Sequence, residues 1–91
     1  MNNLLRRYEE ENLVLKEFNT VLQELDNLYL DNLPSKGESW KHMGTDWLKY
    51  SKVKEEYYEM YMVDDINSKE QRKEILDLIL VLLMLAKRLE K

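Results

Sequence analysis

The fold is decided by a run of residues that is apolar except at one position: Ile75-Leu76-Asp77-Leu78-Ile79-Leu80-Val81-Leu82-Leu83-Met84-Leu85-Ala86. An ionised carboxylate taken out of water costs on the order of several kcal/mol unless a cation or hydrogen-bond donors compensate for it. In a helix, Glu74 lies on the same face as Asp77, three residues earlier. Two acids that point the same way from an apolar helix indicate a bound metal ion.

The composition predicts a helical chain. The 91 residues are 44% hydrophobic and 35% charged, which is typical of a globular protein, and they form a single predicted domain, 1–91. One proline and two glycines favour an all-α fold of three helices. The third helix is apolar nearly all round its C-terminal half, and two neighbours cannot cover it. We therefore expect an oligomeric helical bundle, either a homodimer or a dimer of dimers.

Several classes of partner are not expected. The net charge is −4, and no basic stripe that could follow nucleic-acid phosphates is present. The absence of cysteine excludes disulfides and thiolate metal sites. The apolar run 75–86 is too short to span a bilayer and contains Asp77. We expect no nucleic-acid or membrane partner and a cytoplasmic location.

Spacing and capping residues place the helices. A long first helix, about 3–33 within the N-terminal region 1–33, has an apolar stripe of Leu15, Phe18, Leu22, Leu25 and Tyr29. Pro34 is expected to end it. Thr45 is the predicted N-cap of a second helix, 46–62. Ser68 is the predicted N-cap of a third helix that ends near residue 89, with Gln71 completing a capping box.

The second helix contains another pair of acids, Glu56 and Glu59, again three residues apart. They share a side of the helix with Leu48, Val53, Met60 and Val63. If the second and third helices pack antiparallel, four carboxylates converge. Each pair at about 4 Å then repels by on the order of 4 kcal/mol at an effective dielectric constant near 20. Oxygen ligands without histidine or cysteine suit Mg²⁺ or Mn²⁺, although a solvated acidic helix face is the alternative interpretation.

These acids form a recognisable motif. The string Glu55-Glu56-x-x-Glu59, then 14 residues, then Glu74-x-x-Asp77, resembles the EExxE and ExxD motifs of the MazG-like all-α nucleoside triphosphate pyrophosphohydrolases. The segment Gly37-Glu38-Ser39-Trp40-Lys41 is similar to a segment that precedes EExxE in small phage and prokaryotic members. The resemblance covers about 36–89. Tyr58 stands where these proteins often have a small residue.

The resemblance implies a function. Members of the family hydrolyse a nucleoside triphosphate to the monophosphate and pyrophosphate, as a house-cleaning activity on the nucleotide pool. Glu56, Glu59, Glu74 and Asp77 would bind Mg²⁺, and Glu55 and Glu56 would be the catalytic acids, with Glu55 orienting a water or a ligand. The predicted substrate-binding residues are the cations Lys41, Lys52 and Lys54 and the aromatic residues Trp40 and Trp47.

Other interpretations stay open. Tyr50, Tyr57 and Tyr61 form a stripe that either stacks on a nucleobase or packs in a core or subunit interface. A phosphoribosyl-ATP pyrophosphohydrolase shares the carboxylate arrangement and a start similar to Lys52-x-x-Glu55-Glu56. A helical interaction or regulatory module, which binds a partner through its first helix, is the alternative from a different class. A catalytically degenerate protein that only binds nucleotide lies between these classes.

Overall fold

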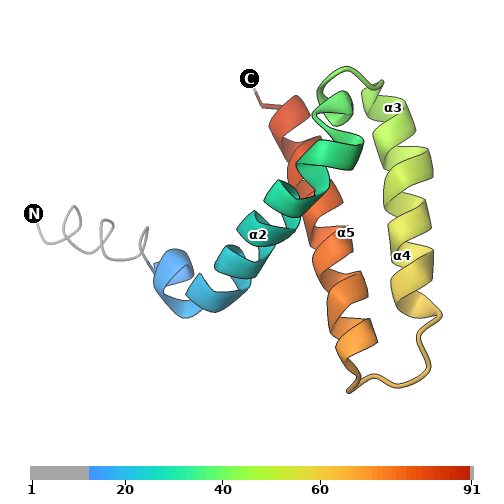
Figure 1. The fold of residues 1–91 in the computed structure, drawn as a ribbon. Coiled ribbons are helices and arrows are strands. Elements are labelled where there is room, and N and C mark those ends of the chain that lie inside the picture. The colour runs from blue at the N-terminus through green and yellow to red at the C-terminus, as the bar shows by residue number, and fades with distance from the viewer. Residues whose placement is uncertain (1–12, 91) are drawn as a thin grey trace, which may run out of the picture. The chain divides into compact units, whose positions relative to one another are not determined.

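The computed structural model describes residues 13–90, and they form helices joined by turns, with no strand in that range (Figure 1). The chain divides into two units, 1–31 and 32–91. The predicted all-α class is therefore confirmed for the described residues. The part of the predicted first helix that precedes residue 13, and residue 91, lie outside them.

In the first unit, residues 13–17 are helical, and a turn at Phe18 precedes α2 (Asn19–Lys36), which continues into the second unit. The backbone bonds Phe18 N to Val14 O (3.0 Å) and Leu22 N to Phe18 O (2.9 Å) keep the helical spacing across this turn. Leu25 is buried, as expected from its place in the apolar stripe, whereas Phe18 is exposed.

The prediction that Pro34 ends the first helix is wrong. Pro34 lies inside the last turn of α2, which runs to Lys36. Proline has no backbone N–H, so only one helical hydrogen bond is lost at this position. Few further backbone N–H donors are needed, because the helix is close to its end. The helix ends at Gly37, whose positive φ of 59° suits glycine and whose N–H donates to the carbonyl oxygen of Leu33 (2.8 Å).

The predicted second helix is a continuous helical stretch made of three parts. These are α3 (Thr45–Trp47), a π-helical segment η2 (Leu48–Val53) and α4 (Lys54–Tyr61), preceded by a short 3₁₀ turn, η1 (Ser39–Lys41). The prediction that Thr45 is the N-cap is wrong. Gly44 has the extended backbone of the cap, and Thr45 is already helical. The cap makes no side-chain hydrogen bond.

The third helix, α5 (Lys69–Arg88), begins where the sequence predicts. The Ser68 hydroxyl accepts a hydrogen bond from the backbone N–H of Gln71 (3.0 Å), which caps the helix. Asp65 orders the connection before it, because its carbonyl oxygen accepts from the Ser68 hydroxyl (2.7 Å) and its carboxylate from the Asn67 N–H (3.0 Å).

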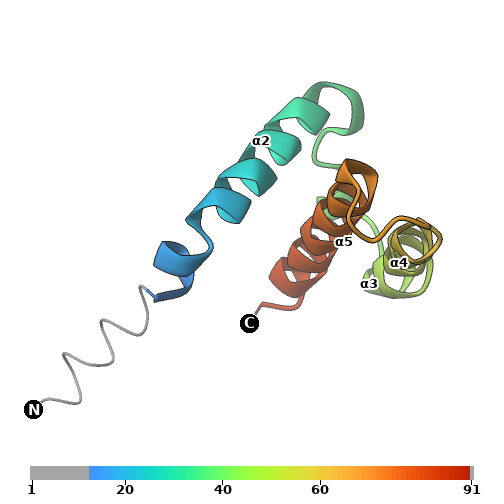
Figure 2. The same ribbon diagram turned by 90° about the horizontal axis from the view of Figure 1, so that it is seen from below.

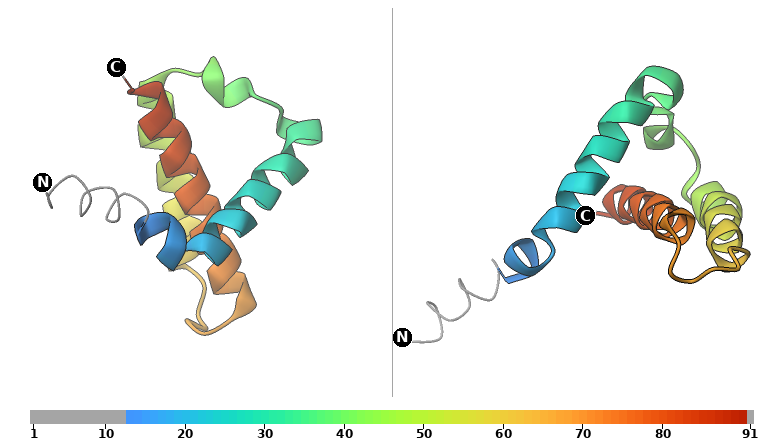
Figure 3. Two further views of the ribbon diagram at one scale, coloured as in Figure 1. Left: turned by 90° about the vertical axis from the view of Figure 1, so that its left-hand side faces the viewer. Right: turned by 60° about the horizontal axis from the view of Figure 1, so that its bottom comes forward.

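Within the second unit, α4 and α5 lie antiparallel and side by side (Figures 1, 2 and 3). The buried apolar residues of this unit are Leu48 in η2 and Val81 in α5. At the other end of α5, Arg88 donates to the carbonyl oxygens of Trp40 (2.9 Å) and Met43, which fixes the η1 region to α5. The packing of α5 on η2 and α4 therefore sets which acids of the two helices meet.

None of the helices within 13–90 is both long enough and apolar enough to cross a membrane.

Candidate metal centre

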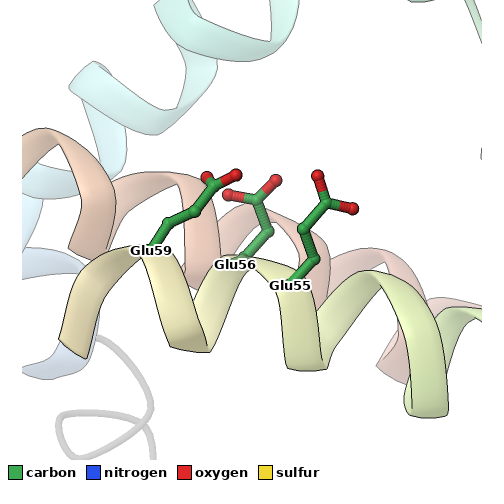
Figure 4. Close-up of side chains that lie close together, drawn as sticks. All are labelled: Glu55, Glu56 and Glu59. Carbon is green, nitrogen blue, oxygen red and sulfur yellow. The ribbon is translucent and has the colours of Figure 1, made fainter. Parts of the chain in front are cut away.

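Three acids project from one side of α4. Glu55, Glu56 and Glu59 follow one another along this helix, and their side chains point the same way (Figure 4). One carboxylate oxygen from each lies within 4.8 Å of the others. Because residues three and four apart are neighbours on a helix, this first cluster follows directly from the sequence spacing.

A second cluster joins the two helices. Glu56 of α4 and Glu74 and Asp77 of α5 each place an oxygen within 4.8 Å of the others. Glu56 therefore belongs to both clusters. The antiparallel packing brings together all four predicted metal ligands, together with Glu55, around this shared residue.

The second cluster lies at the packed surface between the helices. Glu56 is 8% exposed, the only buried charged residue among those described. The Oε2 oxygen of Glu74 is also buried, and it has no hydrogen-bond partner in the described structure. A buried carboxylate oxygen without a donor is costly. A hard cation satisfies such an oxygen, so the residues present fit Mg²⁺ or Mn²⁺.

The first cluster is more open, because Glu55 and Glu59 are exposed. The pKa of Glu59 lies above its ordinary value of 4.5, chiefly because the negative charge of Glu56 is close. Slight desolvation of the carboxylate, the charges of Glu74 and Glu55, and a hydrogen bond with Glu56 raise this pKa further. The five acids thus repel one another, and a divalent cation among them would relieve that repulsion.

Two lysines partly offset this negative charge. The Lys52 Nζ lies 3.3 Å from Glu56 Oε1 and 4.0 Å from Glu55 Oε2, and its side chain is 28% exposed. Lys73 Nζ lies 3.9 Å from Asp77 Oδ2 but is 69% exposed. Lys52, which the sequence predicts to bind substrate, is thus paired with the carboxylates, and Lys73 is a further cation that the sequence analysis does not include. Its spacing of four residues from Asp77 was the available signal.

The other predicted substrate-binding residues are spread along the unit. Lys54 lines a hollow beside Glu55 and Glu59. Lys41 is engaged elsewhere, because its Nζ lies 2.8 Å from Glu38 and 5.7 Å from the centre of the Trp40 ring.

The two tryptophans do not join the acids in the described chain. Trp40 is held at the end of α5 through Arg88, 11 residues beyond Asp77, which corresponds to about 16 Å of helix. Trp47 is 46% exposed. Neither residue lines the hollows beside the acids.

Tyr58 is an aromatic residue that the sequence analysis did not assign to the site. It lines two hollows beside the carboxylates, one of about 620 Å³ with Glu59 and Glu74 and one of about 380 Å³ with Lys54 and Glu55. Tyr57 and Tyr61 instead stack on each other, with ring centres 6.3 Å apart. The position of Tyr58 directly before Glu59, four residues after Lys54, was the signal for its place here.

No protein-family model, curated protein or solved structure matches this chain.

Proposed function

We propose that this protein is a Mg²⁺-dependent nucleotide pyrophosphohydrolase of the MazG-like kind, which converts a nucleoside triphosphate to the monophosphate and pyrophosphate. The observation that carries the proposal is that Glu56 is shared by two carboxylate clusters on α4 and α5. The order of these acids along the chain supports it, because the string resembles the EExxE and ExxD motifs.

The chemistry of the acids supports Mg²⁺, with Mn²⁺ as the alternative. Glu56, Glu59, Glu74 and Asp77 would hold the ion through carboxylate oxygens, the ligands that hard cations prefer. The bound ion would neutralise phosphate charge and acidify a coordinated water. Buried Glu56 is fixed by the Lys52 ammonium. Glu55 is exposed and does not belong to the second cluster, so it can orient a water at the substrate.

The basic residues support a role in binding phosphates. Lys52 and Lys54 flank the acids from the same stretch of helix. A triphosphate brings four negative charges to a site that already carries five carboxylates, so local cations are needed for charge balance. In this proposal Lys54, beside Glu55 and Glu59, holds the phosphates furthest from the nucleoside.

Exposed apolar residues on α5 and directly after it support self-association. Leu82 and Leu83 are 44% and 50% exposed, and Ile75 and Leu89 are also exposed. A homodimer or a dimer of dimers would bury this face. The proposed setting is the cytoplasmic nucleotide pool.

A specific observation also favours the partner-binding alternative. Leu13, Val14, Leu15 and Phe18 are each more than half exposed. Such a patch can bind the apolar face of another helix. This function does not require a metal ion, so metal dependence separates it from the enzyme.

The test is incubation of the full chain and Mg²⁺ with a panel of canonical and modified nucleoside triphosphates, with phosphoribosyl-ATP included. The expected result is pyrophosphate release from at least one of them, and its loss in Asp77→Asn. Turnover of phosphoribosyl-ATP alone would favour that narrower activity. No release from any compound, or full activity in Asp77→Asn, contradicts the proposal.

A further inference from the structure

The two hollows beside the carboxylates meet at Tyr58 and Glu59, which line both. Their volumes, about 620 and 380 Å³, are within the range of small-molecule sites. Glu59 belongs to the first carboxylate cluster, and Glu74 of the second cluster lines the larger hollow. A ligand whose charged end lies at the acids can therefore extend into the larger hollow past Tyr58.

The larger hollow combines an apolar wall with hydrogen-bond acceptors. The Tyr58 ring, Met62 and Val63 supply the wall. The charged side chains that line the hollow are all carboxylates. Beyond Glu59 and Glu74 they are Asp64 and Asp65 in the α4–α5 connection and Glu70 in the first turn of α5. Because carboxylates only accept hydrogen bonds, these side chains favour a group that brings donors as well as a flat apolar face.

Among these acceptors, Asp64 is the best placed to select a ligand. The neighbouring Asp65 already accepts from the Asn67 N–H, and the Ser68 hydroxyl already accepts from the Gln71 N–H. Asp64 is exposed and belongs to neither cluster. Glu70, which also lines the hollow, lies in the first turn of α5, where the helix N-terminus stabilises its charge, whereas Asp64 directly follows Met62 and Val63 of the apolar wall. A hydrogen-bond acceptor on a ligand would be repelled by the negative charge of Asp64, whereas a donor would be bound. Asp64 therefore discriminates between ligand groups that donate and groups that accept.

The smaller hollow has a different character. Tyr50 and Tyr58 line it together with Lys54, the only cation among its described lining residues, and with Glu55 and Glu59, whose charge the proposed metal ion would offset. Phosphates are therefore favoured on the Lys54 side of Tyr58, and a donor-bearing ring on the Asp64 side. A nucleotide would therefore bind in one orientation along α4, with its phosphates toward Lys54 and its base toward Asp64.

We infer that Tyr58 and Asp64 select the base of the nucleotide, and that the site prefers bases with an exocyclic amino group, such as adenine and cytosine, over uracil and thymine. This inference rests on the proposed function. Tyr58 stacks on the base, and Asp64 accepts a hydrogen bond from the amino group. Uracil and thymine place a carbonyl oxygen where those bases carry that group.

The experiment measures binding to the full chain with Mg²⁺ by calorimetry. The probes are the α,β-methylene analogues of ATP, CTP and UTP, which resist cleavage at that bond, and inorganic tripolyphosphate. We expect the ATP and CTP analogues to bind at least about tenfold more tightly than the UTP analogue. Asp64→Asn, whose amide both donates and accepts, should bring this ratio close to one, whereas the control Asp46→Asn should preserve it.

Variants of Tyr58 distinguish the contribution of base stacking to binding from the contribution of the phosphate contacts. Tyr58→Leu should weaken all three nucleotide analogues about tenfold and leave tripolyphosphate binding unchanged. Tyr58→Phe and the control Tyr61→Leu, which changes a tyrosine outside both hollows, should bind like the wild type.

Two results have different meanings. Tripolyphosphate binding together with equal affinity for the three analogues, or with no effect of Tyr58→Leu, overturns the inference and leaves the proposed function standing. Failure of tripolyphosphate and of every nucleotide analogue to bind overturns the proposed function and the inference with it.

Discussion

Lys52 holds its ammonium nitrogen 3.3 Å from Oε1 of Glu56, so a lysine in the last turn of the π-helical segment is the counter-ion of the most buried acid. The extra residue in a π-helical turn changes which side chains face the neighbouring helix, and such turns are frequent at functional sites. Here the segment η2 precedes the three acids of α4 directly.

Replacing Lys52 with methionine should have opposite effects on the metal-free protein and on metal binding. Loss of a partly buried ion pair should lower the free energy of unfolding without metal by about 1–2 kcal/mol. Removal of a positive charge next to Glu56 should tighten Mg²⁺ binding. Chemical denaturation and a Mg²⁺ titration measure the two effects.

The control is Lys73→Met, because Lys73 is 69% exposed and its Nζ lies 3.9 Å from Asp77. We expect it to change the free energy of unfolding by less than about 1 kcal/mol. Weaker Mg²⁺ binding in Lys52→Met than in the wild type would contradict the role of Lys52 as a counter-ion that competes with the metal.

Glu59 should make the metal-free protein less stable as the pH rises. Its pKa in the folded state is raised by Glu56, by burial, and by Glu74 and Glu55, whereas the unfolded chain titrates near the ordinary value of 4.5. Between these two values the folded state binds more protons, so its stability falls as the pH increases through the folded pKa. In the presence of a chelator, Glu59→Gln should raise the Tm at pH 7 by at most a few degrees, because solvent screens the charges around this exposed side chain.

This gain should disappear below pH 4.5, where Glu59 is protonated in both states. Thermal unfolding from pH 4 to pH 8 measures it, with the exposed Glu17→Gln as the matched control. If the Tm increase caused by Glu59→Gln became larger toward acid pH, charge repulsion could not be its cause.

The Ser68 cap should contribute measurably to stability. Its hydroxyl accepts from the Gln71 N–H at 3.0 Å and starts the helix that carries Glu74 and Asp77. Ser68→Ala should cost about 1 kcal/mol and lower the Tm by roughly 4–8 °C. Ser35→Ala is the control, because the Ser35 hydroxyl makes only an exposed 3.3 Å bond to the Asn32 carbonyl. Equal Tm values for the two variants would mean that the cap contributes nothing.

Local signals explain what the sequence predicted well. Ser68 was identifiable because a serine before a helical stretch supplies an acceptor that the first turn needs. Glu56 with Glu59, and Glu74 with Asp77, were predictable as pairs because residues three apart share a helix face.

The remaining features depend on packing or on small backbone differences. The sharing of Glu56 between two clusters depends on how far α4 and α5 slide past each other, which no spacing within one helix determines. Pro34 predicts a helix end, but the left-handed backbone of Gly37 ends the helix instead. Spacing along α4 places Tyr58 beside Glu59, but the larger hollow that Tyr58 lines depends on the turn after Tyr61.

The central proposal is that Glu56 binds Mg²⁺ together with Glu59, Glu74 and Asp77, and thermal unfolding with increasing Mg²⁺ tests it most directly. A free Mg²⁺ concentration of 100 times the Kd stabilises the folded state by about 2.7 kcal/mol. We therefore predict a Tm increase on the order of 10 °C in the wild type and in Glu17→Gln. Glu56→Gln, which weakens both clusters at once, should lose most of this increase. A wild-type Tm that does not change with Mg²⁺, or a full increase in Glu56→Gln, would contradict the account.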